Sequence, residues 1–189
     1  MQRTWKQVLV LAVLALGGTA TAQAQMEQSN PMVGGMAMFA TKDIIDNAVN
    51  SPDHTTLVAA VKAAGLVDAL KAKGPFTVFA PTNAAFSLLP EGAVATLLKP
   101  ENKSMLTGVL TYHVVAGRYD AKALMELIRQ GHGTGVLKTL NGGTLWVMMN
   151  GDRNIVVKDG KGTVANISVY DVYQSNGVIL VVDKVLMPA

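Results

Sequence analysis

The chain has 189 residues, half of them hydrophobic, with 16 basic residues, 13 acidic residues and no cysteine. The absence of cysteine excludes disulfide bonds, thiolate metal sites and a thiol nucleophile. Two of the basic residues, Arg3 and Lys6, fall in a predicted export signal, so the remainder has a net charge of +1. That balance, without any cluster of Lys and Arg, predicts that no nucleic acid is bound.

Residues 1–24 are typical of a cleavable secretory signal peptide. Two positive residues precede an uninterrupted apolar run over residues 8–16, which is too short to span a bilayer. Two overlapping Ala-x-Ala cleavage sites follow, and the cut after Ala24 is favoured over the cut after Ala22. An uncleaved membrane anchor is the alternative, but it would need about 20 apolar residues. We therefore expect a secreted or periplasmic protein with no membrane span after cleavage.

Residues 25–39 are rich in Gly, Met and polar residues and show neither helical nor strand periodicity. This composition predicts that residues 25–39 form a flexible leader in front of one domain at residues 40–189. The leader contains four methionines, Met26, Met32, Met36 and Met38. Because thioether sulfurs favour Cu(I), periplasmic copper binding through the leader is the alternative function. Methionines that pack onto a partner or onto the domain would explain the same composition.

Apolar residues at helical spacing over residues 41–64 predict two helices with a break at Ser51-Pro52. Thr55 or Thr56 fits the N-cap of the second helix, and Gly65 can adopt the left-handed conformation that ends it. A β-branched and aromatic run over residues 76–80 then predicts a strand.

Pro81 stops this strand, and Thr82 fits the N-cap of a short helix after it. Prolines 90 and 100 open two further helices. Residues 112–115 read as another strand, in which neighbouring side chains point to opposite faces. Asp120 then fits the N-cap of a helix that ends near residue 131.

The last third of the chain is predicted to be β. Five strand-like runs cover residues 136–140, 144–149, 154–158, 163–172 and 178–186, separated by turns rich in Asn, Asp and Gly. Leu145, Val147 and Met149 alternate with Trp146 and Met148, which predicts a sheet covered on both sides. If the second face instead points outward, Trp146 and Met148 would form an apolar contact patch. Helices first and hairpins last predict the α+β class.

Three segments together resemble the fasciclin (FAS1) domain family. The first is FTVFAPTNAAF at residues 76–86, the second is the pair Tyr112-His113, and the third is NGVILVVDKVL at residues 176–186, with Pro188 close behind. The resemblance covers about residues 40–188. It implies a FAS1-type β-wedge sheet packed with several short helices, in an extracellular or periplasmic protein that mediates adhesion.

The same resemblance points to four candidate partner-binding residues. Tyr112 and His113 stand at the family's Tyr-His motif, which is tied to adhesion in some members, although both can act by holding the fold. Asp171 and Val172 correspond to an Asp-Ile element that animal members use to recognise integrins, and the change to valine makes an integrin partner doubtful. We expect His113 to be internally hydrogen-bonded and neutral, because a buried histidine needs polar partners.

No motif in the sequence assembles a reaction centre. The three histidines, His54, His113 and His132, are far apart and lack the context of a zinc protease, a Gly-x-Ser-x-Gly hydrolase or a P-loop. The sequence therefore predicts an exported, non-catalytic binding module without a cofactor. Its expected partner is a cell-surface or matrix protein or polysaccharide, and cross-linking by one domain would require self-association or multivalent partners.

Overall fold

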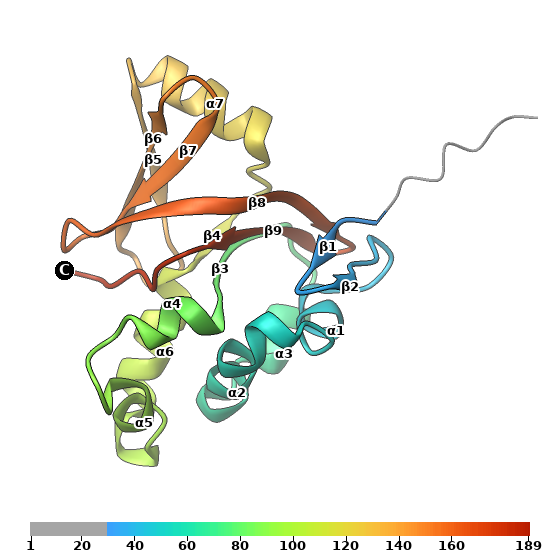
Figure 1. Ribbon diagram of the computed structural model, residues 1–189, viewed down its shortest axis with the longest axis vertical. Coiled ribbons are helices and arrows are strands. Elements are labelled where there is room, and N and C mark those ends of the chain that lie inside the picture. Colours follow the sequence, from blue (N-terminus) through green and yellow to red (C-terminus); the bar gives the residue numbers. More distant parts are fainter. Residues whose placement is uncertain (1–29) are drawn as a thin grey trace, which may run out of the picture.

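The computed structural model describes residues 30–189 (Figure 1). The predicted signal peptide, its cut after Ala24 and the methionine at position 26 lie outside the described residues. Within residues 30–189, no helix has the length and apolar character needed to cross a membrane.

The described helices all end by residue 130, with four short strands among them, and only strands follow. The helices are α1 (Ile44–Ala48), α2 (Thr55–Ala64), α3 (Val67–Lys71), α4 (Asn83–Ser87), α5 (Ala93–Leu97), α6 (Lys103–Tyr112) and α7 (Ala121–Gln130), with 3-10 turns at Pro52–His54 and Pro100–Asn102. The strands are β1 (Met32–Val33), β2 (Met36–Ala37), β3 (Phe76–Pro81), β4 (Val114–Ala116), β5 (Thr134–Lys138), β6 (Thr144–Asn150), β7 (Asn154–Lys158), β8 (Val164–Gln174) and β9 (Gly177–Val182). This order confirms the α+β class.

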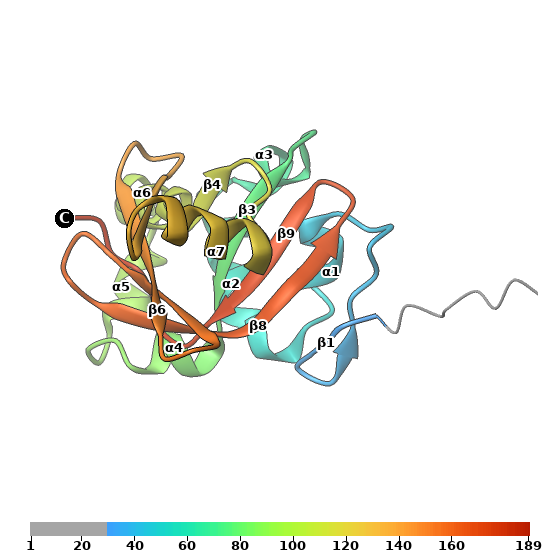
Figure 2. The same cartoon turned by 90° about the horizontal axis from the view of Figure 1, so that it is seen from above.

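Seven strands form one strongly curled sheet in the order β4-β3-β9-β8-β7-β6-β5. Only the β3–β9 pair is parallel within the described sheet. Strand β8 pairs with β7 through its first residues and with β9 through its last, and register shifts between Ile167 and Val172 bend it between the two partners. The Leu140 N–H donates to the Val114 carbonyl at 2.8 Å, which brings the end of β5 against β4. The sheet is therefore nearly a closed barrel (Figure 2).

The sheet separates two hydrophobic cores. Alternation along β3 places Val78 and Ala80 in the core shared with α1–α6, and Phe79 in the core under α7. Strand β9 repeats the pattern, with Ile179 on the first side and Leu180 on the second. Each of these valine, isoleucine, leucine and phenylalanine side chains stabilises the fold by about 1.5–3 kcal/mol when fully buried. In Figure 1, α1–α6 lie below the sheet and α7 lies in the angle between β5–β7 and β8–β9.

Three predicted helix ends are confirmed. Thr82 Oγ1 accepts a hydrogen bond from the Ala85 N–H at 3.2 Å at the start of α4. Asp120 Oδ1 accepts from the Ala123 N–H at 2.8 Å at the start of α7. Gly65 ends α2 with a φ of 73°, in the left-handed region that glycine adopts without strain.

The predicted cap of α2 is wrong. Neither Thr55 nor Thr56 is the N-cap; that position belongs to His54, whose side chain caps nothing. The Thr56 N–H instead donates to Oδ1 of Asn83 at 3.0 Å, and Asn83 Nδ2 donates to the Pro52 carbonyl at 2.8 Å. A side chain of the first fasciclin-like segment therefore caps a helix 27 residues earlier in the chain.

The predicted flexible leader over residues 25–39 is wrong for its final part. Strands β1 and β2 form a small hairpin, and Val33 and Met38 are only 5% and 2% exposed. The side chain of Asn47 holds both backbone groups of Phe39, at 3.0 Å to its N–H and 2.8 Å to its carbonyl. Two-residue strands are too short to produce a recognisable period, and the domain body begins before residue 40.

The predicted strand over residues 112–115 is wrong in its first half. Helix α6 continues through Tyr112, His113 is its C-cap, and β4 begins at Val114. The helical spacing of Leu106 and Val109 extends into the Tyr-His pair and outweighs the local β propensity. The pair therefore points into two cores from a helix end and does not alternate across a strand.

Candidate functional site

Tyr112 is buried, with 1% of its surface exposed, and its hydrogen bonds connect distant segments. Its hydroxyl donates to the Thr144 carbonyl at 2.6 Å and accepts from the Gly160 N–H at 2.8 Å. Burial raises the pKa of the phenol, which therefore stays protonated and able to donate. Tyr112 joins the end of α6 to β6 and to the turn between β7 and β8.

His113 is also buried, with 2% of its surface exposed, and its hydrogen bonds connect α6 to a distant segment. Its Nε2 lies 2.9 Å from the Leu186 backbone nitrogen, which can only donate, so Nε2 is the acceptor. The hydrogen is therefore on Nδ1, which donates to the Val109 carbonyl at 2.8 Å near the end of α6. Burial lowers the pKa of His113 from 6.5 to about 4. The expected internally bonded, neutral histidine is confirmed.

Acidification from pH 6.5 to 4.5 is expected to lower the free energy of unfolding by about 2 kcal/mol. The unfolded chain binds a proton on His113 near pH 6.5, whereas the folded protein does so only near pH 4. This stability is fully present above pH 6.5 and is lost as the pH falls towards the folded pKa. Burial lowers the pKa of His54 too, which adds an effect of the same sign. Urea unfolding at several pH values measures the change, and equal free energies throughout would contradict it.

Asp171 and Val172 lie at an irregularity of β8, and they face different surroundings. Asp171 is partly exposed and has a φ of 57°, and its Oδ1 accepts from the Ala121 N–H at 2.7 Å in the first turn of α7. Val172 is fully buried and pairs with Ile179 of β9. Beside them, Tyr173 is 39% exposed. Of these two candidates, only Asp171 has a side chain that reaches the surface.

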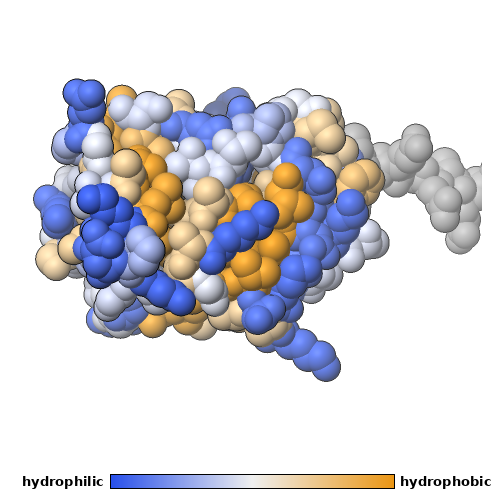
Figure 3. Space-filling model, turned by 90° about the horizontal axis from the view of Figure 1, so that it is seen from below, coloured by the Kyte–Doolittle hydropathy of each residue, from blue (hydrophilic) through white to orange (hydrophobic). Residues whose placement is uncertain are grey.

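His113 and Val172 share one environment, and it lies inside the molecule. Both line an apolar cavity of about 50 Å³ between α1, α2 and the sheet. Figure 3 shows apolar side chains gathered on the helical underside of the molecule, the side on which α2 lies.

His54 also lines the cavity; its Nδ1 pairs with Ser51 Oγ at 2.9 Å, and its Nε2 has no hydrogen-bond partner among residues 30–189. The nearby Ala80 carbonyl partly offsets the effect of burial on the His54 pKa.

The structure thus does not gather the four candidates at one site. Tyr112 faces the core under α7, His113 and Val172 face the cavity, and Asp171 faces outward at the start of α7. A partner-binding role of these residues stays a prediction. For the three buried side chains, such a role requires that they act through the backbone they hold.

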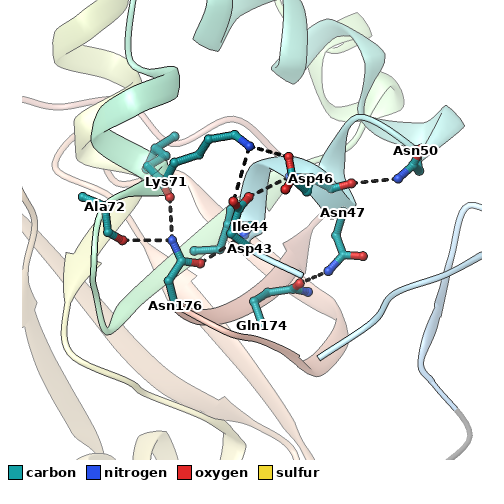
Figure 4. A network of polar contacts seen from close by, with 10 residues as sticks. Asp43, Ile44, Asp46, Asn47, Asn50, Lys71, Ala72, Gln174 and Asn176 are labelled. Atoms are coloured by element: carbon teal, nitrogen blue, oxygen red, sulfur yellow. Dashed lines mark hydrogen bonds and ion pairs between the residues drawn. The ribbon is translucent and has the colours of Figure 1, made fainter. Parts of the chain in front are cut away.

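Asn176, the first residue of the third fasciclin-like segment, has a structural role that the sequence pattern does not reveal (Figure 4). The Asn-Gly pattern predicts an ordinary hairpin turn here, but Asn176 is only 9% exposed. Its Nδ2 donates to the Leu70 carbonyl at 2.7 Å and the Ala72 carbonyl at 3.1 Å, and its Oδ1 accepts from the Ile44 N–H at 3.1 Å. It therefore fastens α1 and α3 to the β8–β9 turn. No local pattern signals contacts that are more than 100 residues apart.

Beside Asn176, two further polar groups hold the same helices (Figure 4). Lys71 of α3 forms ion pairs with Asp43 and Asp46 at the start of α1. Asn47 of α1 donates to the side chain of Gln174 at the end of β8. These contacts connect the N-terminal helices to the last hairpin of the sheet.

Three of the four leader methionines lie within the described residues, and their surroundings differ. Met38 is buried in the helical core, whereas Met32 and Met36 are exposed. The copper alternative therefore loses one of its four thioethers. Across the described part of the chain, no three His, Asp or Glu side chains form a group that could hold a metal ion.

The sequence profile of the Fasciclin domain matches residues 52–188. This chain belongs to the fasciclin domain family. Among relatives of this fasciclin domain, Protein sll1483 of Synechocystis sp. is 43% identical over 182 residues, covering 94% of this chain and 92% of that protein. The cell surface glycolipoprotein MPB83 of Mycobacterium bovis is 34% identical over 171 residues, covering 87% of this chain and 70% of that protein.

The fold of this fasciclin domain also has a solved counterpart. A FAS1 domain pair from the insect cell adhesion molecule Fasciclin I aligns with 77% of this chain at a TM-score of 0.68 and 20% identity. This chain spans about half, 51%, of that solved chain. The FAS1-type architecture that the sequence signatures imply is thereby confirmed.

Proposed function

We propose that this fasciclin domain is an exported, non-catalytic module that binds a protein partner at the cell surface or in the matrix. The observation that carries the proposal is that both polar groups of the Tyr-His motif are used inside the fold. The Tyr112 hydroxyl and both His113 nitrogens each have internal partners, which leaves neither residue free for proton transfer to a substrate. The cell-surface relative and the adhesion-molecule counterpart support the same function.

The contact surface of this proposal is the α7 ledge, which consists of Asp120, Asp171 and Tyr173. Asp171 uses Oδ1 to cap α7, and its Oδ2 has no hydrogen bond within residues 30–189. The Tyr173 hydroxyl donates to Asp120 Oδ2 at 3.1 Å, so the exposed ring is held beside two carboxylates. An aromatic ring next to carboxylates suits a partner that presents Arg or Lys among apolar side chains. Val172, which is buried and lies between Asp171 and Tyr173 in the chain, would hold the backbone of the α7 ledge in place.

The substitution Asp171→Asn is expected to weaken binding of the exported protein to cell envelopes of the producing organism about tenfold or more. Asparagine tolerates the left-handed backbone and keeps an oxygen for the Ala121 N–H, so the change removes mainly the charge. Asp68→Asn on exposed α3 is the matched control and should bind normally. Sedimentation of labelled protein with the envelopes measures both, and normal binding by Asp171→Asn would contradict the proposed contact.

A further inference from the structure

Among the described helices, only α7 packs closely against β5 and β6. On the outer face of β5, β6 and β7, Val156, opposite Met148, is buried, whereas the positions around Trp146 reach the surface. Helix α7 packs against the opposite, concave face, where Leu124 and Ile128 share a core with Leu145 and Val147 (Figure 2). Trp146 alternates with these residues along β6 and points the other way. The expectation of a sheet covered on both sides is therefore wrong around Trp146, where Val136 and Lys158 are exposed and Trp146 is partly exposed.

A row of four side chains crosses this face, and we call it the Trp146 row. The strand registers place Val136 opposite Trp146, Trp146 opposite Lys158, and Lys158 opposite Val164. Val136 and Val164 are 52% and 38% exposed, Lys158 is exposed and Trp146 is partly exposed. Four adjacent strands give the row a length of about 14 Å. The row is an apolar and aromatic strip with a cation inside it.

The exposed charges around the Trp146 row are positive. Trp146 and Met148 line an open hollow of about 510 Å³ together with Lys158 and Lys161. Neither lysine has an ion-pair partner within residues 30–189. The one acid in the hollow, Asp159, is 1% exposed, and its carboxylate already accepts three backbone N–H groups at 2.7–3.0 Å. The surface is therefore complementary to an anion.

We propose that the Trp146 row binds an acidic polysaccharide. The flat apolar faces of sugar rings pack on Trp146, and sugar carboxylates pair with Lys158 and Lys161. A nucleic acid fits less well, because the exported chain has a net charge of only +1 and no basic stripe. The proposal stands apart from the α7 ledge, since the two surfaces share no residue. With both surfaces, a single domain bridges a protein and a glycan without self-association.

Tryptophan fluorescence tests this proposal directly. The chain has two tryptophans, and Trp5 lies in the predicted signal peptide, so Trp146 is the single reporter in the exported protein. Titration with polygalacturonate at low salt should change the emission of Trp146 in a saturable way, and about 0.5 M NaCl should largely reverse the change. Dextran, which is neutral, should leave the emission unchanged. No response to polygalacturonate, or an equal response to dextran, would overturn the proposal.

Two sets of variants complete the test. The double substitution Lys158→Gln and Lys161→Gln should raise the dissociation constant for polygalacturonate about tenfold, whereas Lys103→Gln on α6 should leave it unchanged. Trp146→Phe, followed by equilibrium dialysis, should weaken binding while its circular dichroism stays normal. Unchanged affinity in the lysine double variant would overturn the proposal. Tighter binding to vesicles of anionic phosphatidylglycerol than to polygalacturonate would assign the face to a membrane and also overturn it.

Discussion

Replacing His113 with alanine is expected to lower the free energy of unfolding by about 3–5 kcal/mol. The substitution removes a buried ring and leaves a cavity between the helices and the sheet. It also leaves the Leu186 N–H and the Val109 carbonyl without their partner, although both are shielded from water. Urea denaturation followed by circular dichroism at neutral pH measures the loss.

The matched control for this prediction is His132, which is exposed in the turn between α7 and β5. Its φ is 53°, so His132→Asn is the suitable change, because asparagine accepts the left-handed region more readily than alanine does. The control should change the free energy of unfolding by no more than about 0.5 kcal/mol. A loss below about 1 kcal/mol for His113→Ala would show that the internal bonds of His113 do not hold the fold.

Replacing Asn176 with alanine is expected to cost about 2–4 kcal/mol. The side chain makes three buried or part-buried hydrogen bonds, and no other side chain in the described structure takes over the Ile44 N–H. The loss should concentrate in the N-terminal helices. Hydrogen exchange of the amides of α1 and α3 should therefore accelerate more than exchange in β5–β7.

Asn50 provides the comparison for Asn176. Its Nδ2 also donates to a backbone carbonyl, that of Asp46 at 2.7 Å, but the residue is exposed and the bond lies within one helical turn. Water can replace that bond, so Asn50→Ala should cost less than about 1 kcal/mol. Equal losses for the two asparagines would contradict the role of Asn176 as a fastening between distant segments.

Local signals in the sequence predict much of the fold. Thr82 and Asp120 cap their helices because a cap depends only on the residues next to it. Gly65 ends α2 for the same reason. The alternation of Leu145 and Trp146 identifies the two faces of β6, since a strand has a period of two. These features require no knowledge of the rest of the chain.

Contacts between distant segments could not be predicted in this way. Asn83 and Asn176 use their side chains on backbone groups of other helices, and the same residues also fit ordinary caps and turns. The strand expected at Tyr112 is instead a helix end, because the helical spacing of Leu106 and Val109 continues through Tyr112 and outweighs the local β propensity.

For the candidate site, too, the local sequence pattern predicts one part and the three-dimensional packing decides the rest. The sequence signatures identify the family, but they do not tell whether a signature residue faces a partner or the core. His113 and Val172 are buried, whereas Asp171 is exposed, although Asp171 and Val172 are adjacent. The difference comes from the irregularity of β8, where Asp171 adopts its left-handed backbone and turns towards α7. No periodic pattern marks that irregularity in advance.

Envelope binding by Tyr112→Phe and Asp171→Asn, compared at a temperature where both variants are fully folded, separates support of the fold from contact. Tyr112→Phe loses two internal hydrogen bonds but changes no surface group, so it should bind like the unaltered protein. Asp171→Asn should lose most of its binding. Weak binding by a folded Tyr112→Phe variant, together with normal binding by Asp171→Asn, would contradict the account.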